Sequence, residues 1–135
     1  MTKAVWMVGT FLVMYLFATI LGFATYLLLS PLAMWISVFT IMPAVSALLI
    51  FACLRKLKIS PKASLRESLL VAATWILLSF ALDSLLYIAV IPFFFHLAPN
   101  WGFFRDQSPW IWISYGVLLL SALAAQSVYR RKVHD

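Results

Sequence analysis

The stretch LLVAATWILLSFALDSLLYIAVIPFFF, residues 69–95, decides the fold. It carries one charged residue, Asp83, and it exceeds the roughly 20 residues that a helix needs to cross about 30 Å of hydrocarbon. Strands of transmembrane β-barrels alternate apolar and polar residues, whereas this run is apolar on every face. The stretch therefore predicts a membrane-spanning helix.

Three further apolar runs of similar length occupy most of the remaining chain. With 65% hydrophobic and 10% charged residues, the 135-residue chain has too little polar surface to cover a soluble globule. The first run is far longer than the 7–15-residue core of a secretory signal, so it is also interpreted as a span. We predict an all-α membrane protein, an antiparallel bundle of four transmembrane helices in one integral membrane domain, residues 1–135. The predicted spans are 4–29, 32–54, 65–94 and 110–129.

Positive charge is concentrated before the first span, between the second and third spans, and after the fourth. Under the positive-inside rule this places both termini and the loop 55–66 on the cytoplasmic side of the cytoplasmic (inner) membrane. Because such charges are the ordinary orientation signal, we predict no nucleic-acid partner, but contact of loop 55–66 with anionic lipids. The residues concerned are Lys3, Arg55, Lys56, Lys58, Lys62, Arg66, Arg130, Arg131 and Lys132.

Local signals locate the helix ends. Ser30-Pro31 predicts a tight reversal between the first two spans, since proline lacks the N–H that a continuous helix requires. The motif from Ser64 to Glu67 matches the S-x-x-E capping box, which predicts that the third helix starts near Leu65. The single cysteine, Cys53, excludes an intramolecular disulfide and is predicted to serve packing.

Asp83 is the strongest functional signal. A carboxylate near the bilayer centre costs about 2.5–3.5 kcal/mol on insertion scales, so it should face the bundle interior, a water-filled cavity or a partner subunit. The interiors of the four spans hold no Lys, Arg or His that could pair with it. His96 lies about 20 Å further along the helix axis and reaches Asp83 only if the outer loop folds inward.

Helical spacing and depth predict the neighbours of Asp83. Ser79 and Tyr87 flank it at i−4 and i+4 on one stripe of the third helix. Counting along each predicted span brings Thr19, Thr40 and Tyr115 to a similar depth. The predicted pocket therefore comprises Asp83, Ser79, Tyr87, Thr19, Thr40 and Tyr115.

Two functions stay open at this stage. The first is a membrane protein that binds or transports a small or lipophilic ligand, or a proton, at Asp83. We expect such a protein to be a homo-oligomer, because four short helices enclose little volume. The second is a non-catalytic accessory or structural subunit of a larger membrane complex. Only two histidines occur, and no Ser-His-acid or metal-ligand cluster can be placed on one face, so we predict no enzyme, cofactor or metal.

Two resemblances bear on these alternatives. The basic loop, the motif from Ser64 to Glu67, the pair Leu82-Asp83 and Tyr87 resemble features of bacterial four-helix inner-membrane proteins of unknown function. This resemblance spans about residues 55–115 and implies the fold but no activity. In size and helix number the chain also looks like the small multidrug resistance transporters. Their membrane-embedded glutamate lies in the first helix, which has no acid here, so none of their functional residues carries over.

Overall fold

The computed structural model describes residues 2–134, and this part of the chain is helical with no strand. Helices α3, η1 and α4 run on without a break from Ser64 to Phe94, which makes four helices long and apolar enough to cross a membrane. The prediction of four spans is thereby confirmed. The elements are α1 (Lys3–Leu28), α2 (Pro31–Lys56), α3 (Ser64–Asp83), the π-helix η1 (Ser84–Val90), α4 (Ile91–Phe94), α5 (Phe103–Asp106) and α6 (Trp110–His134).

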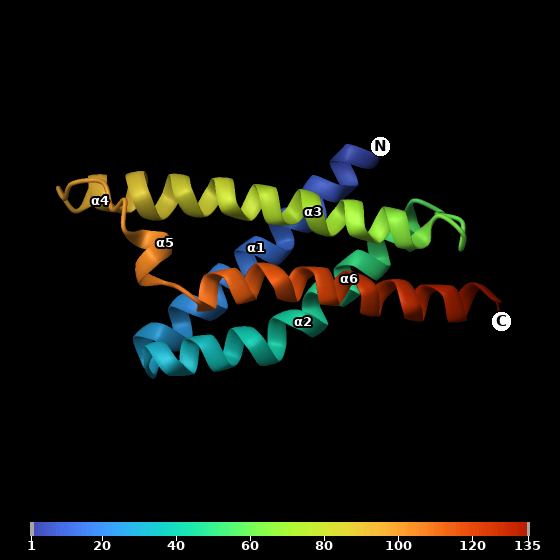
Figure 1. Ribbon diagram of the computed structural model, residues 1–135, viewed down its shortest axis with the longest axis horizontal. Helices are drawn as coiled ribbons and strands as arrows, with labels where there is room; N and C mark the ends of the chain where they lie inside the picture. Colours follow the sequence, from blue (N-terminus) through green and yellow to red (C-terminus); the bar gives the residue numbers. More distant parts are fainter. Residues whose placement is uncertain (1, 135) are drawn as a thin grey trace.

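The molecule has two distinct ends (Figure 1). Both ends of the chain and the α2–α3 connection lie at one of them, here called the proximal end. The α1–α2 turn and residues 95–109 lie at the other, the distal end. Helix α2 packs along both α1 and α6, and α6 packs along α3, whereas α1 and α3 touch over a shorter stretch. Helix α3 therefore packs mainly against α6, and over a shorter stretch against α1 and α2.

The reversal between α1 and α2 follows the sequence prediction. Helix α1 ends at Leu28 and α2 begins at Pro31, whose missing N–H is no loss at the first position of a helix. The Ser30 side chain accepts a hydrogen bond of 3.1 Å from the backbone N–H of Ala33. An N-cap of this kind stabilises a helix start by about 1 kcal/mol, so this short turn is well defined.

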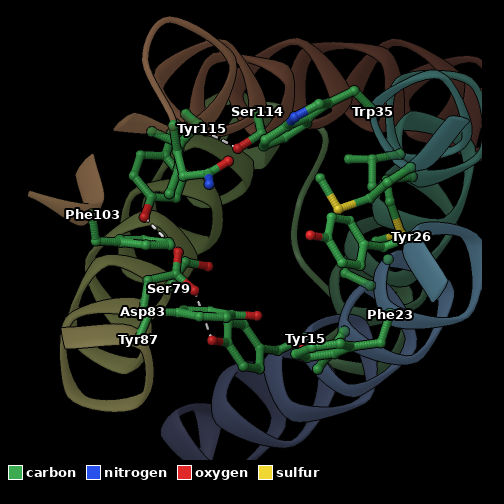
Figure 2. A pocket seen from close by; sticks show the side chains of 18 of the residues that line it. Tyr15, Phe23, Tyr26, Trp35, Ser79, Asp83, Tyr87, Phe103, Ser114 and Tyr115 are labelled. Carbon is green, nitrogen blue, oxygen red and sulfur yellow. Dashed lines mark hydrogen bonds between the residues drawn. The ribbon is translucent and has the colours of Figure 1, made fainter. Parts of the chain in front are cut away.

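The hydrophobic core occupies the proximal half. Its fully buried side chains include Trp75 of α3 together with Ile50, Cys53 and Leu54 of α2, which agrees with the packing role predicted for Cys53. The indole Nε1–H of Trp75 donates a hydrogen bond of 3.1 Å to the carbonyl of Met7, which ties α3 to α1. The distal half instead surrounds a cavity (Figure 2). Outward-facing apolar side chains, among them Leu28 at 80% exposure, are those expected to contact lipid.

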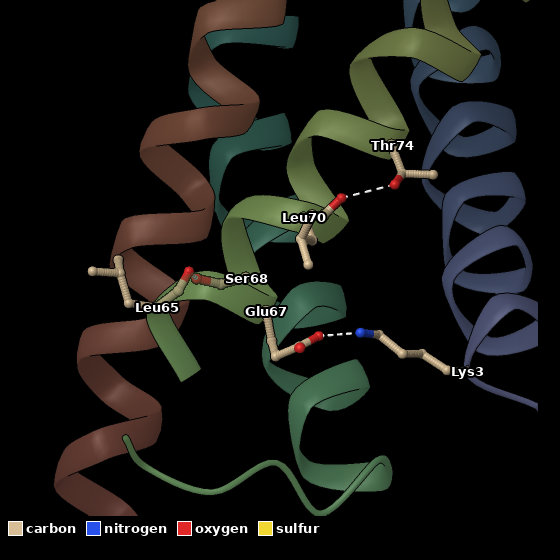
Figure 3. A network of polar contacts seen from close by, with 6 residues as sticks. All are labelled: Lys3, Leu65, Glu67, Ser68, Leu70 and Thr74. Carbon is tan, nitrogen blue, oxygen red and sulfur yellow. Dashed lines mark hydrogen bonds and ion pairs between the residues drawn. The ribbon is translucent and has the colours of Figure 1, made fainter. Parts of the chain in front are cut away.

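The predicted capping box at the start of α3 is wrong. Helix α3 begins at Ser64 itself, and the residue before it, Ala63, has no side chain that could cap. The Ser64 hydroxyl donates a hydrogen bond of 2.7 Å to the Pro61 carbonyl. Glu67 forms an ion pair with Lys3 at the start of α1 (Figure 3). The motif lost its expected pairing because a cation from another helix offers the glutamate a stronger partner than a backbone N–H.

The third span is predicted to be a single α-helix, but in the structure it is not α-helical throughout. From Ser84 to Val90 it is a π-helix, in which the N–H of Ile91 bonds to the carbonyl of Leu86, five residues back. Pro92 has no N–H to offer the carbonyl of Ile88, one turn earlier. That carbonyl accepts a hydrogen bond of 2.9 Å from the backbone N–H of Asn100. The proline thus frees an acceptor to which the following loop binds, and the loop folds back along the helix.

Replacing Trp75 by phenylalanine tests the contact between α1 and α3. The change removes the hydrogen bond to Met7 and leaves part of a fully buried site unfilled. We expect the free energy of unfolding to fall by about 1–3 kcal/mol in equilibrium denaturation from mixed micelles. The matched control is Trp101→Phe, because Trp101 is 81% exposed, and it should change stability by less than about 0.5 kcal/mol. Equal effects of the two substitutions would contradict this account of the core.

Candidate functional site

A cavity of about 940 Å³ lies in the distal half of the molecule. It is lined from α1, α2, the third span, residues 97–107 and α6, and Figure 2 shows the side chains that surround it. Its proximal limit is the packed core, marked by Met14 and Ser46, which both line the cavity and are almost fully buried. Polar groups in the lining come from every one of these elements. They are Tyr15, Thr19, Tyr26, Trp35, Ser46, Ser79, Asp83, Tyr87, Asn100, Gln107, Ser114 and Tyr115.

Asp83 lies in the cavity wall between two tyrosines. The phenol of Tyr15 donates a hydrogen bond of 2.7 Å to Oδ1, and the phenol of Tyr115 donates one of 2.6 Å to Oδ2. The three residues come from α1, α3 and α6, so the carboxylate joins three helices (Figure 2). Among residues 2–132, whose side chains the structure describes, the only ion pairs are Lys3 with Glu67 and Arg105 with Asp106, so phenols rather than cations satisfy this carboxylate.

Most of the residues predicted from depth and spacing meet at this cavity. Thr19, Ser79, Tyr87 and Tyr115 all line it together with Asp83. Thr40 does not: its side chain is exposed, and its hydroxyl donates a hydrogen bond of 2.8 Å to the carbonyl of Ile36 in its own helix. Counting residues gave the height of Thr40 in the membrane but not the face of α2 on which it lies. Its predicted place in the pocket is therefore corrected.

Tyr15 is the partner of Asp83 that depth alone missed. It lies one helical turn before Thr19 and on the same face of α1, because residues four apart are neighbours on a helix. The depth count compared backbone positions, whereas a phenol hydroxyl lies at the far end of a long rigid ring. The signal that could have found it is a tyrosine one helical turn from Thr19, on the face of α1 already assigned to the pocket.

The loop after the third span covers the distal side of the cavity. Asn100, Phe103 and Gln107 line it, and the ring of Phe103 stacks on that of Tyr87 with centroids 4.7 Å apart and planes 2° from parallel. On its other side Tyr87 stacks with Phe23 of α1 at 6.4 Å. The loop does fold inward, but His96 is not among the cavity-lining residues. The aromatic residues of this loop therefore close the cavity as well as suiting the membrane interface.

The composition of the cavity wall indicates what kind of site it could form. The side chains described, those of residues 2–132, include no group of three or more His, Cys, Asp and Glu residues that could hold a metal ion. The cavity wall combines one carboxylate with phenols, hydroxyls, two amides and many aromatic and aliphatic groups. A wall of this composition, mainly apolar with a few polar groups at fixed places, is typical of small-molecule binding sites.

Comparison with known proteins adds no further information about this site. The chain matches no protein-family model, no curated protein and no solved structure. The resemblances inferred from the sequence therefore stay predictions, and the cavity itself is the feature that bears on function.

A double-mutant cycle tests the hydrogen bonds to Asp83. We expect Tyr15→Phe and Tyr115→Phe each to lower the free energy of unfolding by about 0.6–1.7 kcal/mol, the range found for hydrogen bonds between membrane helices. In an Asp83→Ala background each change should cost close to nothing, because the acceptor is gone. Tyr26→Phe is the matched control, since Tyr26 lines the cavity without bonding to Asp83. Additive losses, with no coupling to Asp83, would show that the hydrogen bonds from Tyr15 and Tyr115 to Asp83 do not stabilise the protein.

Proposed function

We propose that this protein is a small multi-pass protein of the cytoplasmic membrane that binds a small lipophilic ligand in the cavity around Asp83. The observation that carries the proposal is a carboxylate held by two phenols in the wall of a cavity of about 940 Å³. Binding sites for drug-sized ligands commonly have volumes of roughly 300–1,000 Å³, so the cavity is large enough for one such molecule.

The proposed topology is an antiparallel bundle with both termini in the cytoplasm. Its support is the distribution of charge, because the basic residues predicted to set the orientation belong to the chain ends and the α2–α3 connection, which together form the proximal end. In this orientation the cavity lies in the outer half of the membrane, beneath the loop that contributes Asn100, Phe103 and Gln107 to its lining. We further propose that loop 55–66 contacts anionic headgroups of the inner leaflet.

The asymmetry of the molecule suggests how a ligand would be handled. The distal half holds the cavity, whereas the proximal half is filled by side chains such as Phe11, Ile50 and Trp75, each at most 1% exposed. A ligand bound in this conformation would be separated from the cytoplasmic side by the whole core. Transport across the membrane would therefore require a second conformation, in which α1 and α3 part at the proximal end.

A second candidate is an accessory subunit of a membrane complex, and one observation favours it. Both oxygens of Asp83 already accept hydrogen bonds from within the chain, which would suffice if the residue only locked three helices together. The cavity separates the two candidates, because a purely structural lock needs no such volume beside it.

Filling the cavity tests the proposed function. We expect purified protein in detergent to bind the neutral fluorophore Nile red saturably, and Ala18→Phe to weaken binding because Ala18 lines the cavity. Overfilling a packed site costs about 1–3 kcal/mol, which corresponds to at least roughly fivefold in Kd. The control is Ala24→Phe, an exposed position of α1 outside the lining, which should leave the Kd unchanged. Equal Kd values for wild type and Ala18→Phe would overturn the proposal and favour the accessory role.

Cysteine labelling tests the topology. In a Cys53→Ser background, we introduce Ser108→Cys at the distal end or Ser60→Cys at the proximal end, both at exposed positions. A membrane-impermeant maleimide should label the distal cysteine in intact spheroplasts and the proximal cysteine only after lysis. The reverse pattern would show that the bundle is inserted with the opposite orientation.

A further inference from the structure

The cavity carries a single kind of charge. Among all its lining residues Asp83 is the only Asp, Glu, Lys, Arg or His. A carboxylate in a wall of low dielectric attracts a cation strongly and repels an anion, because few mobile charges are present to screen it. A ligand with a positive group would therefore be selected over a neutral or anionic molecule of the same shape.

The carboxylate also retains acceptor sites. An ionised carboxylate offers about four lone-pair positions, and the two phenols use one on each oxygen. The remaining positions can accept N–H donors, which a protonated amine supplies and a quaternary ammonium does not. The two phenols hold the carboxylate in one orientation before any ligand binds, which lowers the entropy cost of binding.

Across the cavity from Asp83 stands a wall with a different character. Figure 2 shows Tyr26 of α1 and Trp35 of α2 on the side opposite Asp83, with the Tyr26 hydroxyl directed toward the space between them. The ring of Trp35 stacks with that of Phe39, which also lines the cavity, with centroids 5.7 Å apart. Aromatic side chains of this kind bury large apolar area and attract organic cations. The lipophilic body of a ligand would pack here.

Ser46 gives the site a second polar group. Its side chain is fully buried and lines the cavity, and its hydroxyl has no hydrogen-bond partner in the described residues. Other hydroxyls on these helices donate to their own backbone, as Thr25 does to Leu21 and Ser121 to Val117. A buried hydroxyl without a partner is rare and calls for an explanation. A polar group of the ligand would supply that partner.

The two polar groups lie at different depths. At about 1.5 Å per residue, Ser46 is roughly 15 Å from the proximal end of α2 and Asp83 roughly 28 Å from that of α3. The difference is about 13 Å along the bundle. Between these depths the cavity is lined on α2 by Val38, Phe39 and Met42, which form an apolar strip toward Ser46.

We infer that the ligand is an elongated, lipophilic amine that carries one positive charge. Its ammonium group binds Asp83 between Tyr15 and Tyr115, its apolar body lies along the strip on α2, and a hydrogen-bonding group at its other end meets Ser46. This inference rests on the proposed function, since it names the class of molecule that the cavity takes.

Two fluorescent probes that differ in charge test the inference. Dansylcadaverine has a protonated amine separated from a dansyl group by a pentyl chain, and N-acetyl dansylcadaverine is its neutral counterpart. We expect the amine to bind on the order of tenfold to a hundredfold more tightly, the range of a charge-assisted hydrogen bond expressed as a ratio of Kd values. Equal affinities of the wild-type protein for the two probes would overturn the inference without any variant being needed.

Variants then locate the groups responsible. Asp83→Asn should remove the preference for the amine while leaving the Kd of the N-acetyl probe within about twofold, and Asp83→Glu should keep the preference. Ser46→Ala should weaken dansylcadaverine binding by roughly twofold to tenfold, the value of one neutral hydrogen bond. Ser127→Ala is its control, because Ser127 is exposed and outside the cavity. An unchanged Kd in Ser46→Ala would overturn the role given to Ser46.

Nile red distinguishes a failure of the charge inference from a failure of the proposed ligand-binding function. If Nile red binding responds to Ala18→Phe but the amine shows no advantage, the cavity binds ligands and the inference about charge is wrong. If Nile red binding is also insensitive to Ala18→Phe, the proposed function itself fails.

Discussion

The structure depends on how a carboxylate is kept inside a membrane without a counter-ion. Asp83 meets this constraint with two phenols, Tyr15 and Tyr115, at 2.7 and 2.6 Å. Because the phenols come from α1 and α6, satisfying the carboxylate also fixes the positions of three helices relative to one another. An acid that needs its partners in order to stay in the bilayer therefore helps to organise the distal half, together with the stacked rings of Phe23, Tyr87 and Phe103.

The two halves of the molecule are built differently. At the proximal end apolar packing, the indole hydrogen bond of Trp75 and the pair of Lys3 with Glu67 hold the helices together. At the distal end the helices enclose a cavity, and hydrogen bonds and stacked rings connect its walls. The proximal half is thus filled by side chains, whereas the distal half leaves space beside a carboxylate that is held in place. The loop docked on Ile88 and the ring of Phe103 then define the cavity's distal boundary.

Sequence reasoning reached most of this site for a physical reason. Helical periodicity put Ser79, Asp83 and Tyr87 on one stripe, and depth brought Thr19 and Tyr115 to the same level; all five residues line the cavity. It failed for Thr40 because depth does not specify the face of a helix. It missed Tyr15 because the reach of a side chain is not contained in the position of its backbone. The capping box at Ser64 failed because a distant cation, Lys3, competed for Glu67.

By itself, the sequence determined the four spans, the turn at Ser30-Pro31 and the presence of one uncompensated acid in the membrane. These follow from hydrophobic length, the missing N–H of proline and the cost of burying charge, all of which are local properties. Only the tertiary structure decided which groups satisfy Asp83, that residues 84–90 form a π-helix, and that a cavity reaches from Asp83 to Ser46. These features depend on the rotation and separation of whole helices, which long-range packing sets and no local pattern encodes.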